Sequence, residues 1–277
     1  MTTGRLLVCA TPIGNLGDIS ERTRNVLSSA DVIYAEDTRR TAKLLRHLVV
    51  NVDLVSLFAG NEKARTEQLV ESVRSGQTVV LVSDAGMPAI SDPGAAAVRA
   101  VREAGYPVSV VPGPSAVTTA VALSGFGGDR FVFEGFLPRK GRERTERLEA
   151  IGREPRAVVV FASPNRLADD LADLSAACGP SREVAVTREL TKLHEEAWVG
   201  SLGESVDRWS GEVKGEVTLV LGPADPEPPS VEEAIQRART LVAAGTSVRQ
   251  AARQVAAETG VPRRNVYEAL LADQESS

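Results

Sequence analysis

Aromatic residues, cysteines and histidines are scarce in this sequence of 277 residues, and each shortage excludes something. Phe, Trp and Tyr make up only 4% of the chain, so the core must be built mainly from Ala, Val and Leu. The two cysteines, Cys9 and Cys178, are too few for a disulfide framework. No CxxC pair occurs, and the two histidines, His47 and His194, stand far apart in the sequence, so we expect no metal site.

A membrane-length apolar run and an excess of basic residues are also lacking. No apolar stretch is long enough to span a bilayer, and the one near the N-terminus is too short for a signal peptide. We therefore expect a cytoplasmic protein with no membrane association. The 32 Lys and Arg residues are outnumbered by 37 Asp and Glu residues, which gives a net charge of -5. This balance is atypical of a protein that coats nucleic acid, but it permits a local basic patch, because phosphate affinity depends on where charges lie.

The first half of the sequence does contain a regular alternation of strand and helix patterns. Strands rich in β-branched residues are predicted at residues 6–10, 32–35, 52–57, 78–82 and 108–111. Helices are predicted to follow them at residues 20–30, 41–47, 62–75, 94–104 and 115–123. This alternation predicts an α/β domain with a largely parallel sheet, which we assign to residues 1–125.

The rest of the chain divides into a second α/β domain, a linker and a helical tail. The second domain, residues 126–222, has predicted strands at 157–161 and 183–187, a predicted helix at 165–177, and a further predicted strand pair at 195–199 and 216–221. The Pro-rich residues 223–230 form the predicted linker. Residues 231–277 contain three short helical patterns, at 231–244, 247–258 and 262–271, whose spacing is typical of a helix-turn-helix domain.

Four loops rich in Gly and Pro follow predicted strands, at residues 10–18, 83–94, 112–116 and 162–166. In open α/β sheets, ligands bind beyond the carboxyl ends of the strands, so these loops predict a ligand pocket. The first loop has neither the GxGxxG pattern nor the Lys of a phosphate-binding loop. A ligand is therefore expected to be held by backbone amides, small residues and one or two carboxylates.

Two polar residues in these loops each have two interpretations. Asp84 either hydrogen-bonds the hydroxyls or cationic amino group of a ligand, or caps a turn of its own backbone. Ser115 either caps the helix that starts beside it or faces a ligand.

Six segments of the sequence match the pattern of a known family. The chain contains, in this order, LLVCATPIGNLGDIS, YAEDTRRTAKLL, VSDAGMPAISDPG, VPGPSA, FEGFLPRK and TRELTKLHEE. Together they resemble the ribosomal RNA small subunit methyltransferase I family, which belongs to the tetrapyrrole-methylase-like class of S-adenosylmethionine enzymes. The resemblance covers nearly the whole chain, including the linker and the helical tail.

This resemblance implies a fold, a reaction and a set of partners. It implies a two-domain tetrapyrrole-methylase-like α/β fold, with S-adenosyl-L-methionine in the interdomain cleft, plus a small all-helical C-terminal tail. It implies 2′-O-methylation of a cytidine ribose in the decoding region of 16S rRNA, within the small ribosomal subunit, by a homodimer. The implied cofactor contacts are Pro12, Asp84, Ala85, Gly86, Met87, Ile90, Ser115, Ala116 and Ala162.

A proton acceptor is the main catalytic need of such a reaction, because a ribose hydroxyl is a weak nucleophile until it loses its proton. A general base contributes on the order of 10²–10⁴-fold. The candidates are Glu36 and Asp37 of the EDTRR segment, and Lys192 and Glu195 of the TKLHEE segment, with His194 and Glu196 beside them. Spacing does not rank them, since the EDTRR acids suit an ion-pair network as well as catalysis, and His194 suits a structural role equally.

Contacts to RNA are expected from cations in two segments of the chain. The expected RNA-binding residues are Arg39, Arg40, Lys43, Arg139, Lys140 and Arg142, with Lys192 on the same basic face. The charged run at residues 138–147, which supplies three of them, has an alternative interpretation as a solvated loop or the start of a helix.

Two other functions are alternatives at this stage. A tetrapyrrole methyltransferase shares the fold class, and the acidic net charge favours it. A DNA-binding regulator would use the helix-turn-helix-like tail, although the charges of that tail are balanced. In the methyltransferase interpretations the tail either packs or helps to clamp RNA.

Overall fold

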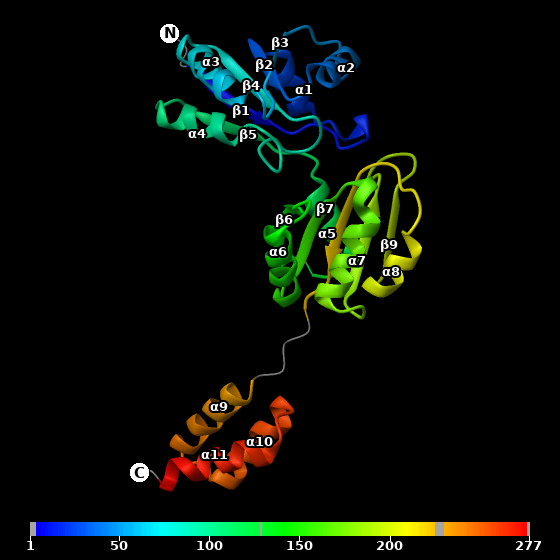
Figure 1. Ribbon diagram of the computed structural model, residues 1–277. Helices are drawn as coiled ribbons and strands as arrows, with labels where there is room; N and C mark the ends of the chain where they lie inside the picture. The colour runs from blue at the N-terminus through cyan, green and yellow to red at the C-terminus, as the bar shows by residue number, and fades with distance from the viewer. Residues whose placement is uncertain (1–3, 128, 225–229, 276–277) are drawn as a thin grey trace. The chain divides into compact units, whose positions relative to one another are not determined.

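The computed structural model describes residues 4–127, 129–224 and 230–275 (Figure 1). The chain separates into two compact units, residues 1–223 and residues 224–277. In the described residues the first unit contains two five-stranded sheets, and the second unit is helical. No helix in these ranges combines the length and the apolar character that crossing a bilayer requires.

The first sheet is parallel throughout and has the strand order β3-β2-β4-β1-β5. Its strands are β1 (Arg5–Cys9), β2 (Val32–Ala35), β3 (Asp53–Ser56), β4 (Thr78–Val82) and β5 (Val108–Val111), as the alternation of patterns predicted. Its helices are α1 (Glu21–Ser28), α2 (Thr38–Leu48), α3 (Glu62–Arg74) and α4 (Ala95–Glu103).

The central strands of this sheet are apolar on both faces because helices cover both. Leu6 packs with α3 and α4, whereas the next residue, Leu7, packs with α1 and α2 on the opposite face. Two such layers of helices leave only the strand ends and their loops free to hold a ligand.

The second sheet is mixed and has the order β6-β7-β10-β8-β9. Its strands are β6 (Phe131–Phe136), β7 (Ala157–Ala162), β8 (Glu183–Arg188), β9 (Glu196–Ser201) and β10 (Val217–Leu221), of which only β6 and β7 form a parallel pair. One face packs against α6 (Arg142–Arg153), α7 (Leu167–Cys178) and α8 (Leu202–Arg208). The helix α5 (Ala116–Ser124) packs against the other face.

Three features of this second layer differ from the sequence-based expectation. The predicted strands 195–199 and 216–221 do not pair with each other, because β10 lies between β7 and β8 and β9 lies at the edge beside β8. The elements β6, α6 and α8 were not predicted as a strand and two helices, although a helix start was one interpretation of residues 138–147.

The third difference concerns α5, which we assigned by sequence to the first domain. The buried stripe of α5, including Val117 and Val121, covers Val159 and Val220 of the second sheet. A helix this apolar needs a sheet face to cover it, and both faces of the first sheet are already covered by α1 to α4. The chain therefore reaches the second layer before α5 and not after residue 125.

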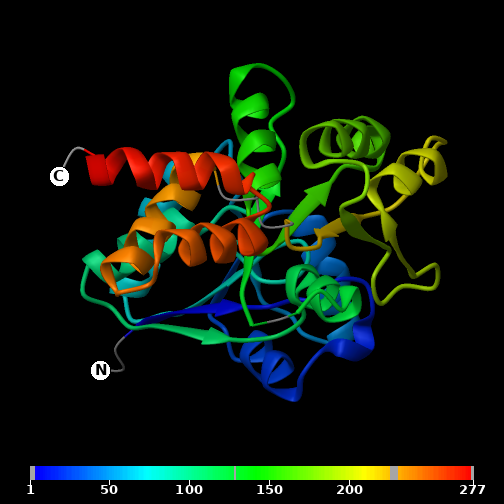
Figure 2. The same ribbon diagram turned by 90° about the horizontal axis from the view of Figure 1, so that it is seen from below.

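The C-terminal unit consists, in its described part, of α9 (Val231–Ala243), α10 (Val248–Thr259) and α11 (Arg263–Glu275). Side chains of Ala and Val fill most of its small core. Ser230 and Ser247 cap the starts of α9 and α10 through their hydroxyls. Figure 2 shows α10 and α11 side by side, as the predicted helix-turn-helix spacing requires. Of the predicted linker, residues 225–229 lie outside the described residues.

Candidate active site

The first two Gly/Pro-rich loops pair with each other beyond the carboxyl ends of β1 and β4. The Thr11 amide donates to the Gly86 carbonyl at 2.9 Å, and the Gly86 amide donates to the Thr11 carbonyl at 3.1 Å. The Thr11 hydroxyl also donates to the Ser83 carbonyl at 3.2 Å. Because β1 and β4 are neighbouring parallel strands, these two loops meet at the edge where such folds bind ligands.

The main cavity, of about 380 Å³, is lined by these loops and by the second sheet. This volume is within the range of small-molecule sites. Apolar side chains such as Ile13 and Phe161 form much of its wall, and Asp92 and Glu216 add two carboxylates. Seven of the nine cofactor contacts implied by the sequence line it: Ala85, Gly86, Met87, Ile90, Ser115, Ala116 and Ala162.

The same two loops also line a smaller hollow of about 210 Å³, which we call the α2 groove. The other two implied cofactor contacts, Pro12 and Asp84, lie here and do not line the main cavity. Arg40 and Lys43 from α2 face the same groove. The loops therefore border both a largely apolar cavity and a groove that carries two cations.

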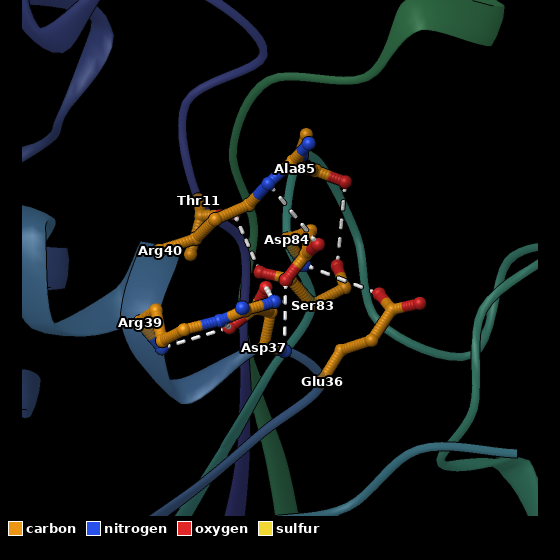
Figure 3. A network of polar contacts seen from close by, with 8 residues as sticks. All are labelled: Thr11, Glu36, Asp37, Arg39, Arg40, Ser83, Asp84 and Ala85. Atoms are coloured by element: carbon orange, nitrogen blue, oxygen red, sulfur yellow. Dashed lines mark hydrogen bonds and ion pairs between the residues drawn. The ribbon is translucent and has the colours of Figure 1, made fainter. Parts of the chain in front are cut away.

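Three acidic residues at the ends of β2 and β4 form the polar network drawn in Figure 3. The Asp37 amide donates to the Asp84 carboxylate at 2.9 Å, and the Asp84 amide donates to the Glu36 carboxylate at 3.3 Å. Arg40 lies 3.5 Å from the second oxygen of Asp84. The Asp84 carboxylate thus holds the loop before α2 in place, which is a structural role different from the turn cap considered from the sequence. Among the described residues no cluster of three or more His, Cys, Asp or Glu could hold a metal ion.

Glu36 and Asp37 are adjacent in the sequence but differ in the state of their carboxyls. Burial raises the pKa of Glu36 above its ordinary value, opposed by the hydrogen bond from the Asp84 amide. Asp37 accepts two hydrogen bonds from the Arg39 guanidinium, at 2.8 and 3.0 Å, and one from the Arg39 amide as the N-cap of α2. These contacts hold the pKa of Asp37 well below its usual range, so its charge is fixed.

Asp92 lines the main cavity and was missed as a candidate by sequence reasoning. Burial raises the pKa of Asp92 to about 6, and the nearby negative charges of Glu36 and Asp84 add to this shift. The residue stands in the segment SDAGMPAISDPG, where its DPG context is typical of an ordinary turn. The one feature of the sequence that could have identified Asp92 is that it is a second carboxylate in the same loop as Asp84.

Lys192 holds one of the carboxylates that line the cavity. Its Nζ donates to Glu189 at 2.7 Å and to Glu216 at 3.0 Å. Burial by itself lowers the pKa of Lys192, but these two hydrogen bonds outweigh it and raise the pKa. A Cβ on Gly14 would overlap the Lys192 side chain, so only glycine lets the first loop approach this closely. Lys192 therefore stays protonated and orients Glu216, which was also missed by sequence reasoning.

The remaining candidates of the TKLHEE segment do not line the main cavity. The Glu195 carboxylate accepts a hydrogen bond from the Thr191 amide, and Glu196 pairs with Arg188 and Arg208. The His194 side chain is exposed. Ser115 is the N-cap residue of α5 but its side chain makes no capping hydrogen bond, so the hydroxyl is available to a ligand in the cavity.

The charged run 138–147 contains two kinds of arginine. Arg144 is buried, where it donates to Asp170 at 2.8 Å, to Asp173 at 2.6 Å and to the Pro138 carbonyl at 2.8 Å. Such an arginine joins α6 to α7 and cannot reach RNA. The side chains of three expected RNA-binding residues in this run are exposed: Arg139, Lys140 and Arg142.

Two family models match the chain. The model described as Tetrapyrrole (Corrin/Porphyrin) Methylases matches residues 5–205. The model described as RsmI C-terminal HTH domain matches residues 229–274. The two matches together cover both units.

Curated relatives named Ribosomal RNA small subunit methyltransferase I match nearly the full length. The relative from Synechocystis sp. is 43% identical over 97% of this chain and 98% of its own length. The one from Mycobacterium tuberculosis is 45% identical over 98% of this chain and 96% of its own. The relative from Thermotoga maritima is 45% identical over 219 residues, which are 79% of this chain and 98% of the relative.

Solved structures resemble the chain at lower identity. Diphthine synthase superposes with a TM-score of 0.63 at 16% identity, covering 79% of this chain and 89% of that one. Uroporphyrin-III C-methyltransferase from Thermus thermophilus, complexed with S-adenosyl homocysteine, superposes with a TM-score of 0.57 at 19% identity, covering 79% and 97%. These likenesses establish the fold, and the relatives establish the narrower group: the chain belongs to the ribosomal RNA small subunit methyltransferase I family, within the tetrapyrrole methylases.

Proposed function

We propose that the chain transfers the methyl group of S-adenosylmethionine to the 2′-hydroxyl of a cytidine ribose in the decoding region of 16S rRNA. The observation that carries this proposal is the main cavity, lined by seven expected cofactor contacts and bordered by the loops that also line a cationic groove. The names of the relatives support ribosomal RNA as the substrate.

The residues around the main cavity fit S-adenosylmethionine. The apolar wall at Ile13, Met87 and Ile90 suits an adenine ring, and the carboxylate of Glu216 suits a cationic group of the cofactor. When bound, S-adenosylmethionine supplies an electrophilic methyl group. The protein must align the ribose oxygen with it, and such positioning lowers a barrier by up to about 7–11 kcal/mol.

A carboxylate of this chain is proposed to take the proton of the ribose hydroxyl. Glu36 keeps this role from the sequence argument, and Asp92 joins it because it lines the cavity and its pKa of about 6 suits a base near neutral pH. Asp37, Lys192 and Glu195 have other partners, so we assign them positioning roles.

Contacts to RNA are proposed for the exposed cations of two segments. Arg40 and Lys43 line the α2 groove, and Arg39 lies on the same helix. Arg139, Lys140 and Arg142 lie on the exposed segment after β6. Alanine substitutions here are expected to weaken RNA binding and to flatten its salt dependence. The reason is that RNA binding releases fewer counterions when fewer phosphates are contacted. An unchanged salt slope contradicts this assignment.

We further propose that the substrate is the rRNA within the small ribosomal subunit, that the chain acts as a homodimer, and that it acts in the cytoplasm. The family resemblance supports all three. Light scattering after size-exclusion chromatography tests the dimer, and methylation of naked rRNA against isolated subunits tests the substrate.

The decisive experiment is transfer of tritiated methyl groups from S-adenosylmethionine to small ribosomal subunits, followed by nuclease mapping. We expect the label on a 2′-oxygen in the decoding region. No label on subunits or rRNA, with cofactor still bound, would favour the tetrapyrrole methyltransferase alternative. That alternative now rests on neighbours at 16–21% identity, which share the fold alone.

A further inference from the structure

Phe136 is the most exposed aromatic side chain of the described chain. Its exposed fraction is 57%, yet it lines the main cavity. Its ring centroid lies 5.4 Å from that of Phe161, which also lines the cavity. The Phe136 ring thus lies beside another ring of the cavity wall while more than half of the residue is exposed. A ligand in the cavity could cover the exposed part of this apolar ring, and burying that surface would favour binding.

A β-bulge places Phe136 in this position. Between the register pairs Phe133 with Val159 and Phe136 with Phe161, β6 uses three residues where β7 uses two. Without the bulge, Phe136 would point to the opposite face of the sheet. Gly135 in the bulge has a φ of 65°, a conformation that favours glycine, and a Cβ there would lie 3.2 Å from the Ser91 hydroxyl. The bulge and its glycine together therefore aim this ring toward the cavity.

The segment that follows the ring is fixed in its backbone and cationic in its side chains. The Pro138 carbonyl accepts a hydrogen bond from Arg144 at 2.8 Å, and the Arg139 carbonyl accepts one from Arg166 at 3.1 Å. The side chains of Arg139 and Lys140 are exposed and form no ion pair with any residue that the structure describes. An exposed ring and two unpaired cations thus lie within five residues of one another on a rigid segment.

We infer that Phe136 is a stacking platform for a base of the RNA substrate, and that Arg139 and Lys140 bind the neighbouring phosphates. This inference rests on the proposed function, since it requires RNA as the substrate. Single-stranded RNA is recognised in this way, by aromatic rings that stack on unpaired bases beside cations that bind the backbone. Stacking on Phe136 would fix the nucleotide at the edge of the main cavity, where its ribose must meet the methyl donor.

The adenine ring of the cofactor is the competing occupant. The rest of the apolar wall, including Ile13 and Met87, already offers a surface for adenine in the main cavity. Phe136, by contrast, is more than half exposed and continues directly into the cationic segment. This continuity favours a ligand that carries both bases and phosphates.

The test compares Phe136→Ala, Phe136→Leu and Phe136→Trp with the wild-type full chain. The RNA probe is an oligonucleotide of the decoding region, with binding followed by fluorescence anisotropy, and S-adenosylmethionine binding is followed by calorimetry. Phe58→Ala is the matched control, because Phe58 is also exposed, at 47%, but lies outside the main cavity. Circular dichroism and thermal unfolding establish that each variant is folded.

We expect Phe136→Ala and Phe136→Leu to raise the Kd for RNA and the KM for methylation about 10-fold, with an unchanged salt slope and a cofactor Kd within about twofold of wild type. Phe136→Trp should retain affinity, and Phe58→Ala should change nothing. Arg139→Ala with Lys140→Ala should instead reduce the salt slope by about 1–2.

Two results would overturn the inference. One is an unchanged RNA Kd in folded Phe136→Ala, and the other is a cofactor Kd that rises as much as the RNA Kd, which would assign the ring to adenine. Failure of the proposed function has a different signature, because the wild-type chain itself would then neither bind the RNA probe nor methylate small subunits.

Discussion

The carboxylates that follow β2 and the one in the main cavity differ, residue by residue, in what fixes their protonation state. Asp37 is ionised because it caps α2 and pairs with Arg39. The carboxyls of Glu36 and Asp92 are partly buried, and burial raises the pKa of each, that of Asp92 to about 6. A group that must accept and release a proton needs the second kind of environment, and this separates Glu36 and Asp92 from the other candidates.

The dependence of rate on pH should identify the proton acceptor. With Asp92 as the base, kcat/KM rises with pH up to about 6 and then levels, because the carboxyl must be ionised to act. Asp92→Asn should then lose about 10²-fold or more in kcat together with this acidic limb, with the cofactor Kd near normal. Glu36→Gln should instead give this loss of kcat if Glu36 is the base, and Asp37→Asn serves as the neighbouring control. Turnover that survives both Glu36→Gln and Asp92→Asn excludes both residues.

Asp92 also makes a prediction about stability. Its carboxyl has an ordinary pKa of 3.8 in the unfolded chain and about 6 in the fold, so the folded state loses stability as pH rises through about 4–6. One pKa unit corresponds to about 1.4 kcal/mol, and partial exposure of the group reduces the effect. We therefore expect Asp92→Asn to be more stable than wild type by about 1 kcal/mol at pH 7.5 and equal to it at pH 4. Urea unfolding at both pH values measures this, and an equal gain at both would contradict it.

At the scale of helices and strands, Arg144 connects three elements. It pairs with Asp170 and Asp173 of α7, and it also holds the backbone of the loop that precedes its own helix, α6. The Asp170 side chain is 5% exposed, so removing its partner leaves a buried charge without compensation. Arg144 is therefore an anchor for the segment that carries Arg139 and Lys140.

Arg144→Met should accordingly destabilise the α/β unit by about 3–5 kcal/mol in urea unfolding. The double variant Arg144→Met with Asp170→Leu should recover part of that loss, because no buried charge is then left unpaired. Arg142→Met is the control, since the Arg142 side chain is 90% exposed in its pair with Glu146 and should change stability by no more than about 0.5 kcal/mol. A loss in Arg142→Met as large as in Arg144→Met would show that the burial argument is wrong.

The elements that sequence patterns predicted, and those they missed, differ in physical character. The strands of the first sheet are short and apolar on both faces, which makes β1 and β4 easy to find. The strand β6 was missed because the bulge at Glu134 and Gly135 breaks its apolar run, α6 because its first turns are highly charged, and α8 because it has only seven residues. The bulge that hid β6 is the feature that aims Phe136 at the cavity.

The site was predicted to a similar extent. Loops at strand ends identified most of the cavity wall, because the carboxyl ends of parallel strands meet at one edge. Asp92 and Glu216 were missed because a carboxylate in a turn or just before a strand has no distinctive sequence pattern. The importance of Asp92 depends on its burial, and that of Glu216 on a neighbour distant in sequence, Lys192. Position in the chain alone does not contain that information.

At the scale of the whole molecule, the chain combines a catalytic α/β unit with a separate helical unit. The alignment with the relative from Thermotoga maritima spans 219 residues, which are 98% of that protein. The relative is therefore about as long as residues 1–223 of this chain. A protein of the same named family thus exists without the length that corresponds to the C-terminal unit. In this chain the main cavity lies wholly within the α/β unit, since the residues that line it fall between 13 and 218.

The charges of the C-terminal unit indicate what it adds. Its described acidic side chains are engaged: Glu232 and Asp273 pair with Arg239, Glu233 caps α9, Glu258 bonds Gln254, and Glu268 pairs with Arg264. Four other arginines form no ion pair with any residue in the described ranges: Arg237, Arg249, Arg253 and Arg263. A unit of balanced composition therefore has cations free for phosphate, which favours the RNA clamp among the interpretations of the tail.

Deletion of residues 224–277 tests whether the α/β unit binds the cofactor alone while the C-terminal unit contributes to RNA binding. We expect the truncated chain to keep the cofactor Kd and the unfolding temperature of the α/β unit, because the two units are separate in their cores. RNA affinity should fall, and the slope of log Kd against log salt should fall by up to about 3 if all four free arginines contact phosphate. The full chain with Arg237, Arg249, Arg253 and Arg263 changed to Ala should reproduce the loss without removing the helices. If truncation instead abolishes cofactor binding while that variant behaves as wild type, the tail supports the fold of the catalytic unit and does not clamp RNA.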